Sequence, residues 1–219
     1  MSEVESPQRF SGRDFPGFAR SRLQADPPPV PDDDVLPPAG DHVLSPGMVE
    51  FMRAQPARAA AVLIPVVARP DELTVLLTTR TSHLPTHAGQ IAFPGGKMDE
   101  ADDSPLATAL REAEEEVGLD RRHVTPLGYC DLYQTGSGFR IVPVVGLVSP
   151  AMTLTINPQE VKDVFEVPLR FLMEAANHQT HSRIWKGIER HYLAIPYGER
   201  YIWGITAGII RNFHDRLLT

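Results

Sequence analysis

The spacing of hydrophobic residues changes along the chain and predicts where strands and helices lie. Two short apolar runs, residues 61–68 and 73–79, flank a polar turn at 69–72, which is the pattern of a β-hairpin. Other apolar runs predict strands at 90–93, 124–133, 140–148, 161–167, 183–185 and 191–195. Helices are expected at 104–117, 169–176 and 205–217. Strands mixed with few helices indicate an α/β or α+β sandwich.

The first 47 residues differ in composition from the rest of the chain. They hold nine of the 21 prolines and lack apolar periodicity, so we expect an extended, Pro-rich arm at 1–47 and one folded domain at 48–219. The simplest interpretation of the arm is a tail or linker. The alternative is an arm that packs on its own domain, or on a second copy in a homodimer, through Phe10, Phe15 and Phe18.

The charge balance and the single cysteine exclude several classes of protein. The 219 residues include 28 acidic and 21 basic side chains, a net charge of −7, which argues against a nucleic-acid partner held by a broad basic surface. A local site for a small phosphate compound is not excluded. Cys130 is the only cysteine, so no internal disulfide is expected, and a reducing, cytoplasmic location fits. No apolar run approaches about 18 residues, and the N-terminus has no apolar signal core, so neither a membrane span nor a secretion signal is expected.

The helix at 104–117 carries the candidate chemistry. Ser104 suits its N-cap, Pro105 its first position and Gly118 its C-terminal cap. At 100° per residue, four apolar residues fall within about 60° of one another and predict the face turned to the core: Leu106, Leu110, Ala113 and Val117.

Three glutamates, Glu112, Glu115 and Glu116, share an arc of about 100° on the opposite side of this helix. If they are partly shielded from water, each like-charge pair costs roughly 3 kcal/mol. Arg111 offsets part of that cost by pairing with Glu115 across one helical turn. A divalent cation would offset more. One interpretation is therefore a solvated acidic face, and the other is a metal site.

The segment before the helix favours the metal site. Phe93-Pro94-Gly95-Gly96-Lys97 brings backbone without side chains, and a cation, close to the glutamates. Oxygen ligands in this number suit Mg²⁺ or Mn²⁺, which bind few carboxylates and keep waters for a substrate phosphate. Metal, open backbone and lysine together are typical of a diphosphate site, where a metal-bound water becomes the nucleophile.

These residues resemble a known family signature. Gly96, followed by Arg111-Glu112-Ala113-Glu114-Glu115-Glu116-Val117-Gly118-Leu119, is similar to the box of Nudix hydrolases, G-x5-E-x7-R-E-U-x-E-E-x-G-U, in which U is a bulky apolar residue. The spacing from Gly96 to Arg111 is one residue longer than in that pattern, and its first glutamate is replaced by Asp102 or Asp103.

The resemblance implies an α/β/α sandwich around a mixed sheet, and attack of water on a diphosphate in a small-molecule substrate. It implies that Glu112 and Glu116 are the principal ligands of Mg²⁺ or Mn²⁺, with Glu115 beside them. Arg111 would hold these carboxylates in place. The general base is left open between Glu115 and Glu160, a loop carboxylate whose other interpretation is a surface acid.

A second stretch resembles the signature of the coenzyme A pyrophosphatase branch of that family, L-L-T-x-R-[SA]-x3-R-x3-G-x3-F-P-G-G. The matching residues are Leu76, Leu77, Thr78, Arg80, Gly89 and 93–96. Thr81 stands where serine or alanine is expected, and Pro85 where arginine is expected. Proline cannot replace the phosphate contacts of a guanidinium, and His83 or His87 is a candidate substitute.

This second resemblance implies cleavage of coenzyme A and its thioesters to 3′,5′-ADP and 4′-phosphopantetheine. The substrate-binding residues would include Arg80, Gly95, Gly96 and Lys97. The structural alternative is a buried strand and a turn, and Trp203 is likewise interpreted as a core residue. Two other functions are considered: hydrolysis of a dinucleotide such as NADH or ADP-ribose, and a binding module without turnover. The intact glutamates argue against the last.

Overall fold

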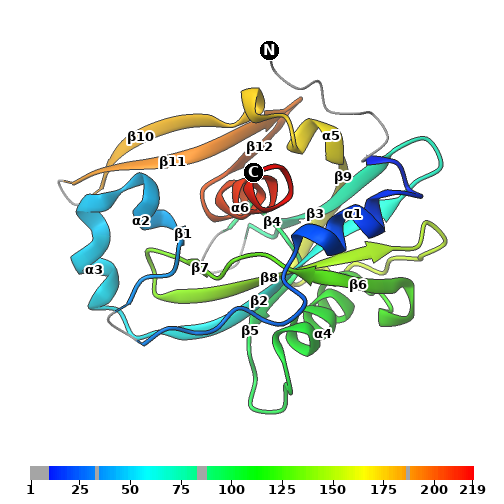
Figure 1. Cartoon of the computed structure of the whole chain (residues 1–219), viewed down its shortest axis with the longest axis horizontal. Helices are drawn as coiled ribbons and strands as arrows, with labels where there is room; N and C mark the ends of the chain where they lie inside the picture. Colours follow the sequence, from blue (N-terminus) through cyan, green and yellow to red (C-terminus); the bar gives the residue numbers. More distant parts are fainter. Residues whose placement is uncertain (1–9, 33–34, 83–87, 186–187) are drawn as a thin grey trace.

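The computed structural model describes residues 10–32, 35–82, 88–185 and 188–219. Within them a mixed sheet of nine strands forms the centre, and an antiparallel sheet of three strands lies apart from it (Figure 1). The large sheet contains β1 (Ala39–Gly40), β2 (Arg58–Ala68), β3 (Leu73–Arg80), β4 (Ile91–Ala92), β5 (Gly95–Lys97), β6 (Val124–Tyr129), β7 (Tyr133–Gln134), β8 (Phe139–Val148) and β9 (Val161–Pro168). The small sheet contains β10 (Gln179–Trp185), β11 (Ile188–Tyr197) and β12 (Arg200–Trp203). The α-helices are α1 (Phe15–Arg22), α2 (Asp41–Leu44), α3 (Val49–Arg53), α4 (Pro105–Val117), α5 (Leu169–Leu172) and α6 (Ile205–Leu218).

Strand β2 is the centre of the large sheet. It runs parallel to β8 from Arg58 to Val67. Its last residues pair antiparallel with β3, which confirms the predicted hairpin, and its first residues pair antiparallel with β5. Strand β3 also pairs with β4 and β9, and β8 also pairs with β6 and β7. The glycine-containing strand β5 is thus fixed to the central strand of the sheet.

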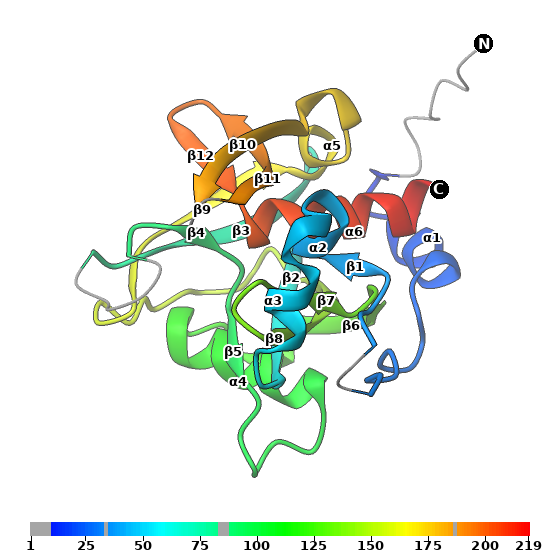
Figure 2. The ribbon, with the colours of Figure 1, turned by 90° about the vertical axis from the view of Figure 1, so that its left-hand side faces the viewer.

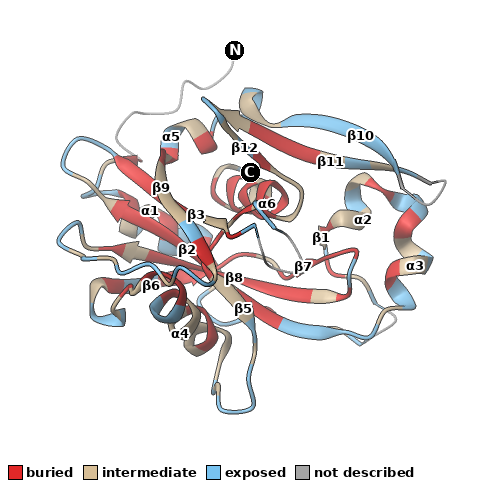
Figure 3. Cartoon of the chain, turned by 180° about the vertical axis from the view of Figure 1, so that it is seen from behind, coloured by how far each residue is buried: buried red, intermediate tan, exposed pale blue. Residues whose placement is uncertain are grey.

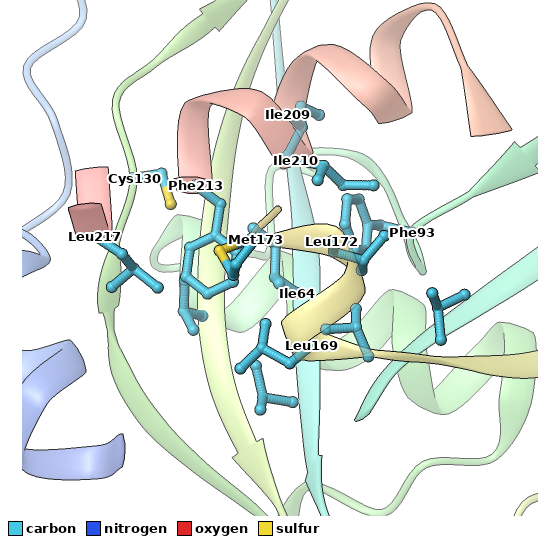
Figure 4. Packing of buried hydrophobic residues seen from close by; sticks show 14 of the residues in the cluster. Ile64, Phe93, Cys130, Leu169, Leu172, Met173, Ile209, Ile210, Phe213 and Leu217 are labelled. Atoms are coloured by element: carbon cyan, nitrogen blue, oxygen red, sulfur yellow. The ribbon is translucent and has the colours of Figure 1, made fainter. Parts of the chain in front are cut away.

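The large sheet lies between two helices, so the chain forms the predicted α/β/α sandwich. Alternate residues of β2 point to opposite faces. Leu63 belongs to a hydrophobic cluster that includes Val117 of α4. Ile64 belongs to the other cluster, with Phe213 of α6, which Figure 4 shows from close by.

Helix α6 is covered on both sides. The large sheet lies on one side of it and the small sheet β10–β12 on the other (Figures 1 and 2). Most of its residues are buried, whereas β10, at the edge of the small sheet, is largely exposed (Figure 3). The small sheet is therefore an addition to the sandwich. No helix within the described residues is both long and apolar enough to span a membrane.

Helix α4 is confirmed at both of its predicted ends. Ser104 Oγ accepts a hydrogen bond from the backbone N–H of Ala107 at 3.1 Å. Gly118 ends the helix at a φ of +65°, a left-handed conformation that favours glycine. Ala113 and Val117 are fully buried, as predicted, while Leu106 and Leu110 pack at the edge of the same cluster.

Other predictions are wrong in extent. The helix expected at 169–176 ends at Leu172, because Asn177 Nδ2 donates to the carbonyl of Phe171 and a separate 3₁₀ turn follows. The strand expected at 124–133 divides into β6 and β7. The pattern does not indicate β5 or β12: β5 is Gly-Gly-Lys, without an apolar residue, and β12 is only four residues long.

The described part of the N-terminal arm packs on its own domain. Three phenylalanines join the hydrophobic core on the α6 side: Phe10, Phe15 and, at its edge, Phe18. Arg140 Nη1 and Nη2 donate to the carbonyls of Pro31 and Asp32, at 2.7 and 3.1 Å. Helix α1 differs from the extended conformation expected here, because Pro16 lies in the first turn, where a helix needs no backbone donor. The domain boundary at residue 48 stays a prediction.

Candidate active site

Arg111 is the centre of the acidic side of the site. Its Nε and Nη2 donate to the two carboxylate oxygens of Asp102, at 3.1 and 2.8 Å. Its Nη2 also donates to the carbonyl of Lys97 at 3.1 Å. Its Nη1 donates to Glu112 Oε1 and Glu115 Oε2, at 3.0 Å each, which confirms the predicted pair with Glu115. One guanidinium therefore connects β5, the loop before α4 and two of the three glutamates.

Asp102, rather than Asp103, is the acidic residue that faces the helix. The Asp102 side chain is 6% exposed, and it also accepts from Asp99 N and Thr108 Oγ1, at 2.9 Å each. These hydrogen bonds, above all those from Arg111, hold the pKa of Asp102 well below its usual range. Asp103 is exposed. The geometry gives Asp102 the position of a partner for Arg111.

Glu116 is turned away from solvent, so a fully solvated acidic face is the wrong interpretation of this helix. The residue is only 2% exposed, and its side chain lies against β5. Its Oε2 accepts from the backbone N–H of Gly95 at 3.3 Å, and its Oε1 faces Arg80 Nη1 at 3.5 Å. Burial raises the pKa of Glu116 to about 8, with added repulsion from Glu112 and Glu160 and partial opposition from Arg80 and Gly95.

The two glycines of β5 make room for these contacts. A Cβ atom on Gly96 would collide with the carboxylate of Glu112, and one on Gly95 would lie 2.5 Å from the carbonyl oxygen of Ala61 in β2. The Glu112 side chain is 16% exposed, and burial is the main cause that raises its pKa. Two carboxylates, at adjacent turns of α4, are thus packed beside open backbone.

The two candidates for the general base differ in their surroundings. The Glu115 side chain is 55% exposed and pairs with Arg111. Glu160 accepts instead from the neutral amide Nδ2 of Asn157 at 3.2 Å. The backbone N–H of Asn157 donates to the carbonyl of Glu116 at 2.9 Å, which fixes this loop to the end of α4. Glu160 therefore lies close enough to Glu112 and Glu116 for its charge to raise the pKa of both.

A cavity of about 510 Å³ opens next to β5, and the four residues expected to bind the substrate all line it: Arg80, Gly95, Gly96 and Lys97. Much of the remaining wall is apolar: Ile91, Phe93, Phe139, Ile141, Ile205 and Ile209. Within the described residues, Arg80 Nε is buried and has no hydrogen-bond partner. The cavity thus combines cationic and open-backbone groups at one side with a hydrophobic surface.

The predicted metal ligands are not arranged as a closed cage. Among the described residues, no group of three or more His, Cys, Asp or Glu side chains is placed to hold a metal ion. The glutamates face arginines instead, since Arg111 contacts Glu112 and Glu115, and Arg80 contacts Glu116. The ligand set therefore stays a prediction.

Comparison with known proteins decides the family. The NUDIX domain model matches residues 57–186, which include the large part of the sheet, α4 and the cavity wall at β5. The chain belongs to the Nudix hydrolase family. Members of this family act on pyrophosphate bonds, and the resemblance noted in the sequence is confirmed at that level.

Two curated relatives, each called uncharacterized Nudix hydrolase NudL, support the assignment. The relative from Yersinia enterocolitica is 45% identical over 158 residues, which cover 72% of this chain and 80% of the relative. The relative from Yersinia pestis strain Pestoides F is 44% identical over 160 residues, with 73% and 80% covered. The coenzyme A branch stays a proposal.

Solved structures of Nudix proteins resemble the chain more weakly. A MutT/nudix family protein from Enterococcus faecalis has a TM-score of 0.46 and 17% identity, covering 75% of this chain and 63% of that one. The NUDIX domain of Shewanella oneidensis NrtR, complexed with ADP ribose, has a TM-score of 0.42 and 22% identity, covering 55% and 78%. The family assignment rests on the domain match and the curated relatives.

Parts of this Nudix hydrolase's site lie beyond what the sequence pattern indicated. Pro85, His83 and His87 fall outside the described residues. Trp203 is not a core residue: it is half-buried and lines a second cavity.

Cys130 is fully buried, as expected, and burial raises the pKa of its thiol. No local motif marks the residues of the second cavity, since they come from distant strands.

Proposed function

We propose that this Nudix hydrolase cleaves the diphosphate bond of coenzyme A and its thioesters, giving 3′,5′-ADP and 4′-phosphopantetheine. One observation carries the proposal. Arg80, Gly95 and Gly96, which belong to the coenzyme A signature, line the same cavity, and Glu116 contacts both Arg80 and Gly95. These contacts support the proposal over the structural alternative, because they bring residues of the signature to a carboxylate of the Nudix box.

The donor set fits Mg²⁺ or Mn²⁺. Mg²⁺ is commonly bound by one or two carboxylates together with substrate phosphates and waters, so the pair Glu112 and Glu116 suffices without a closed cage. The pKa of both carboxyls is raised, mainly because burial disfavours their charged forms. A bound cation would stabilise those charged forms. When bound, such an ion neutralises phosphate oxygens and activates water. Glu115 would join as the third carboxylate.

The residues around the cavity would hold the diphosphate. Arg80 has an Nε donor without a partner among the described residues, and phosphate oxygens are the acceptors that a guanidinium prefers. Gly95 and Gly96 let phosphate approach the backbone closely, and Lys97 supplies a further positive charge at the cavity wall. Arg111 is a positioning residue, because it holds Glu112 and Glu115 and is not itself among the residues that line the cavity.

Of the two candidate bases, Glu160 is the one we propose. A base accepts a proton most readily when no cation holds its carboxylate. Glu115 pairs with the guanidinium of Arg111, whereas the Glu160 carboxylate accepts from the neutral amide of Asn157 and forms no ion pair within the described residues. The variants E160Q and E115Q separate the two: loss of turnover should be larger for E160Q, and a larger loss for E115Q would reverse the assignment.

The substrate is tested directly with the full chain. Purified protein with Mg²⁺ or Mn²⁺ is incubated with coenzyme A, acetyl-coenzyme A, NADH and ADP-ribose, and the products are separated by chromatography. We expect 3′,5′-ADP from the first two substrates at the highest kcat/KM. Faster hydrolysis of NADH or ADP-ribose would overturn the proposal in favour of a dinucleotide hydrolase. Absence of hydrolysis of all four would favour a binding module.

A further inference from the structure

A second cavity, of about 460 Å³, continues from the one beside β5. The two share four lining residues, Arg58, Gln90, Ser137 and Ile205. The second cavity lies between α3 at one side and strands β11 and β12 of the small sheet at the other, and neither the Nudix box nor the matched positions of the coenzyme A signature include its residues. Together the two cavities suit a substrate that extends well to one side of its diphosphate.

Three arginines line this second cavity: Arg58, Arg183 and Arg190. Asp41 is the one carboxylate among the lining residues, and it lies 3.7 Å from Arg190 Nη2. The lining therefore carries two more positive than negative side chains, counting three arginines against Asp41. That excess is local, because the whole chain has a net charge of −7. An anionic group is the chemistry that this wall would attract.

Aromatic rings surround one of these arginines. Tyr192 and Trp203 meet edge to face, with ring centroids 5.5 Å apart. The guanidinium carbon of Arg183 lies 5.2 Å from the Trp203 ring centroid and 5.9 Å from that of Tyr192. These contacts are cation–π interactions that orient an otherwise exposed arginine. Both rings also line the cavity, where a flat heterocycle has surface to stack on.

We propose that the second cavity binds the phosphorylated nucleoside end of the substrate. This inference rests on the proposed function, since it assigns the two halves of coenzyme A to two places. The nucleoside half carries both an aromatic base and a phosphate monoester, which match the rings and the arginines. The pantetheine chain is uncharged, with neither an anionic group for the arginines nor an aromatic ring to stack. Within this proposal Arg183, which the two rings orient at the cavity wall, contacts the 3′-phosphate, and that contact would discriminate against NADH and ADP-ribose, which lack this monoester.

The test is a binding measurement that does not depend on turnover. Adenosine 3′,5′-bisphosphate and AMP are titrated by calorimetry into the full wild-type chain, R183Q and R122Q. Arg122 is a matched control, since its side chain is 84% exposed and pairs with Asp120 away from the cavities. We expect R183Q to lower the affinity for the bisphosphate by at least ~10-fold, which is the loss typical of a hydrogen bond to a charged group. The affinity for AMP should change little. R122Q should match the wild type.

Two results would overturn this site: no binding of the bisphosphate to the wild-type chain, or equal affinity in wild type and R183Q. A uniform loss for both nucleotides would also overturn it, because AMP lacks only the 3′-phosphate, and Arg183 would then not recognise that group. The proposed function fails separately, if the wild type binds the bisphosphate through Arg183 but releases none from coenzyme A. With an active enzyme, R183Q should in addition raise KM for coenzyme A more than KM for its dephospho form.

Discussion

The two ends of the binding region are built in opposite ways. At the α4 end, Glu112 and Glu116 come from adjacent turns of one helix and pack against glycine backbone. At the small-sheet end, Arg58 and Arg183 come from strands more than a hundred residues apart in the chain. The first end concentrates negative charge in a buried place, and the second concentrates positive charge around an open cavity. Local sequence spacing reveals the first kind of site, whereas only the fold assembles the second.

The largest expected effect is at the acidic end. Glu116→Gln should lower kcat for coenzyme A hydrolysis by at least ~10²-fold, because a neutral amide cannot serve as a metal ligand or assist proton transfer. The thermal unfolding temperature should not fall, since burial disfavours the ionised form of Glu116 and a neutral amide carries no such cost. Steady-state kinetics and a melting curve on the same preparation check both parts.

Glu114→Gln is the matched control for that variant. Glu114 lies on the same helix, but its side chain is 47% exposed and pairs with Arg121. The turnover of the Glu114→Gln variant should stay near the wild-type value. Similar activity in both variants would mean that the buried position of Glu116 has no bearing on the reaction.

The second-largest expected effect is on stability, and it tests which aspartate of the loop before α4 holds Arg111. Asp102→Asn should lower the free energy of unfolding by about 2 kcal/mol, the usual cost of losing a hydrogen-bonded charge at a shielded position. Asp103→Asn, one residue away and exposed, should change it by less than about 0.5 kcal/mol. Chemical denaturation measures both. If the two variants were equally destabilised, the contact between Asp102 and Arg111 would not be the stabilising one.

The two buried acids should give pH dependences of opposite sign in metal-free protein. The pKa of Asp102 is lowered on folding, so its stabilisation is present above the unfolded value near 3.8 and is lost as the pH falls below it. The pKa of Glu116 is raised from 4.5 to about 8, so stability falls as the pH rises through that range. Glu116→Gln should remove the second slope and Asp102→Asn the first. A wild-type slope retained in both variants would contradict the assignment.

The smallest effect concerns the start of α4. Ser104→Ala removes the oxygen that accepts from Ala107 N, and we expect a loss of about 1 kcal/mol in the free energy of unfolding. Ser104→Asp should restore most of it, because aspartate caps a helix in the same way. Denaturation of both variants gives the comparison, and an unstable Ser104→Asp would show that the cap is not what Ser104 provides.

Much of the fold follows from short-range patterns. Helix α4 could be placed to the residue, since Ser104, Pro105 and Gly118 are each suited to one position of a helix end. The hairpin of β2 and β3 was equally clear from two apolar runs around Arg69-Pro70. Strand β5 could not be recognised, because Gly95-Gly96-Lys97 becomes a strand only through pairing with β2. Helix α1 could not be recognised because prolines surround it in the sequence. It forms where the side chain of Phe15 is buried in the core.

The site was predictable to a similar depth. Spacing alone brings Arg111 to Glu115, and the structure bears that pair out. The direction of Glu116 was not predictable, because periodicity describes one helix and ignores the strand that covers its flank. Asp102 and Asp103 were equivalent in sequence and differ only by which one meets Arg111. The cluster of Arg183 and Trp203 has no signature, because neither residue is near the other in the chain.

The contact of Arg140 with the carbonyls of Pro31 and Asp32 has a consequence for how the molecule is made. The arm is synthesised before the residues that hold it: Arg140 follows Pro31 by 109 residues, and α6 lies still further along the chain. Phe10 and Phe15 belong to a hydrophobic cluster that also contains Phe213 of α6, so this cluster is incomplete until α6 has been synthesised. The arm therefore packs late, although it is made before these partners, and chaperones or aggregation would compete for its phenylalanines in the meantime.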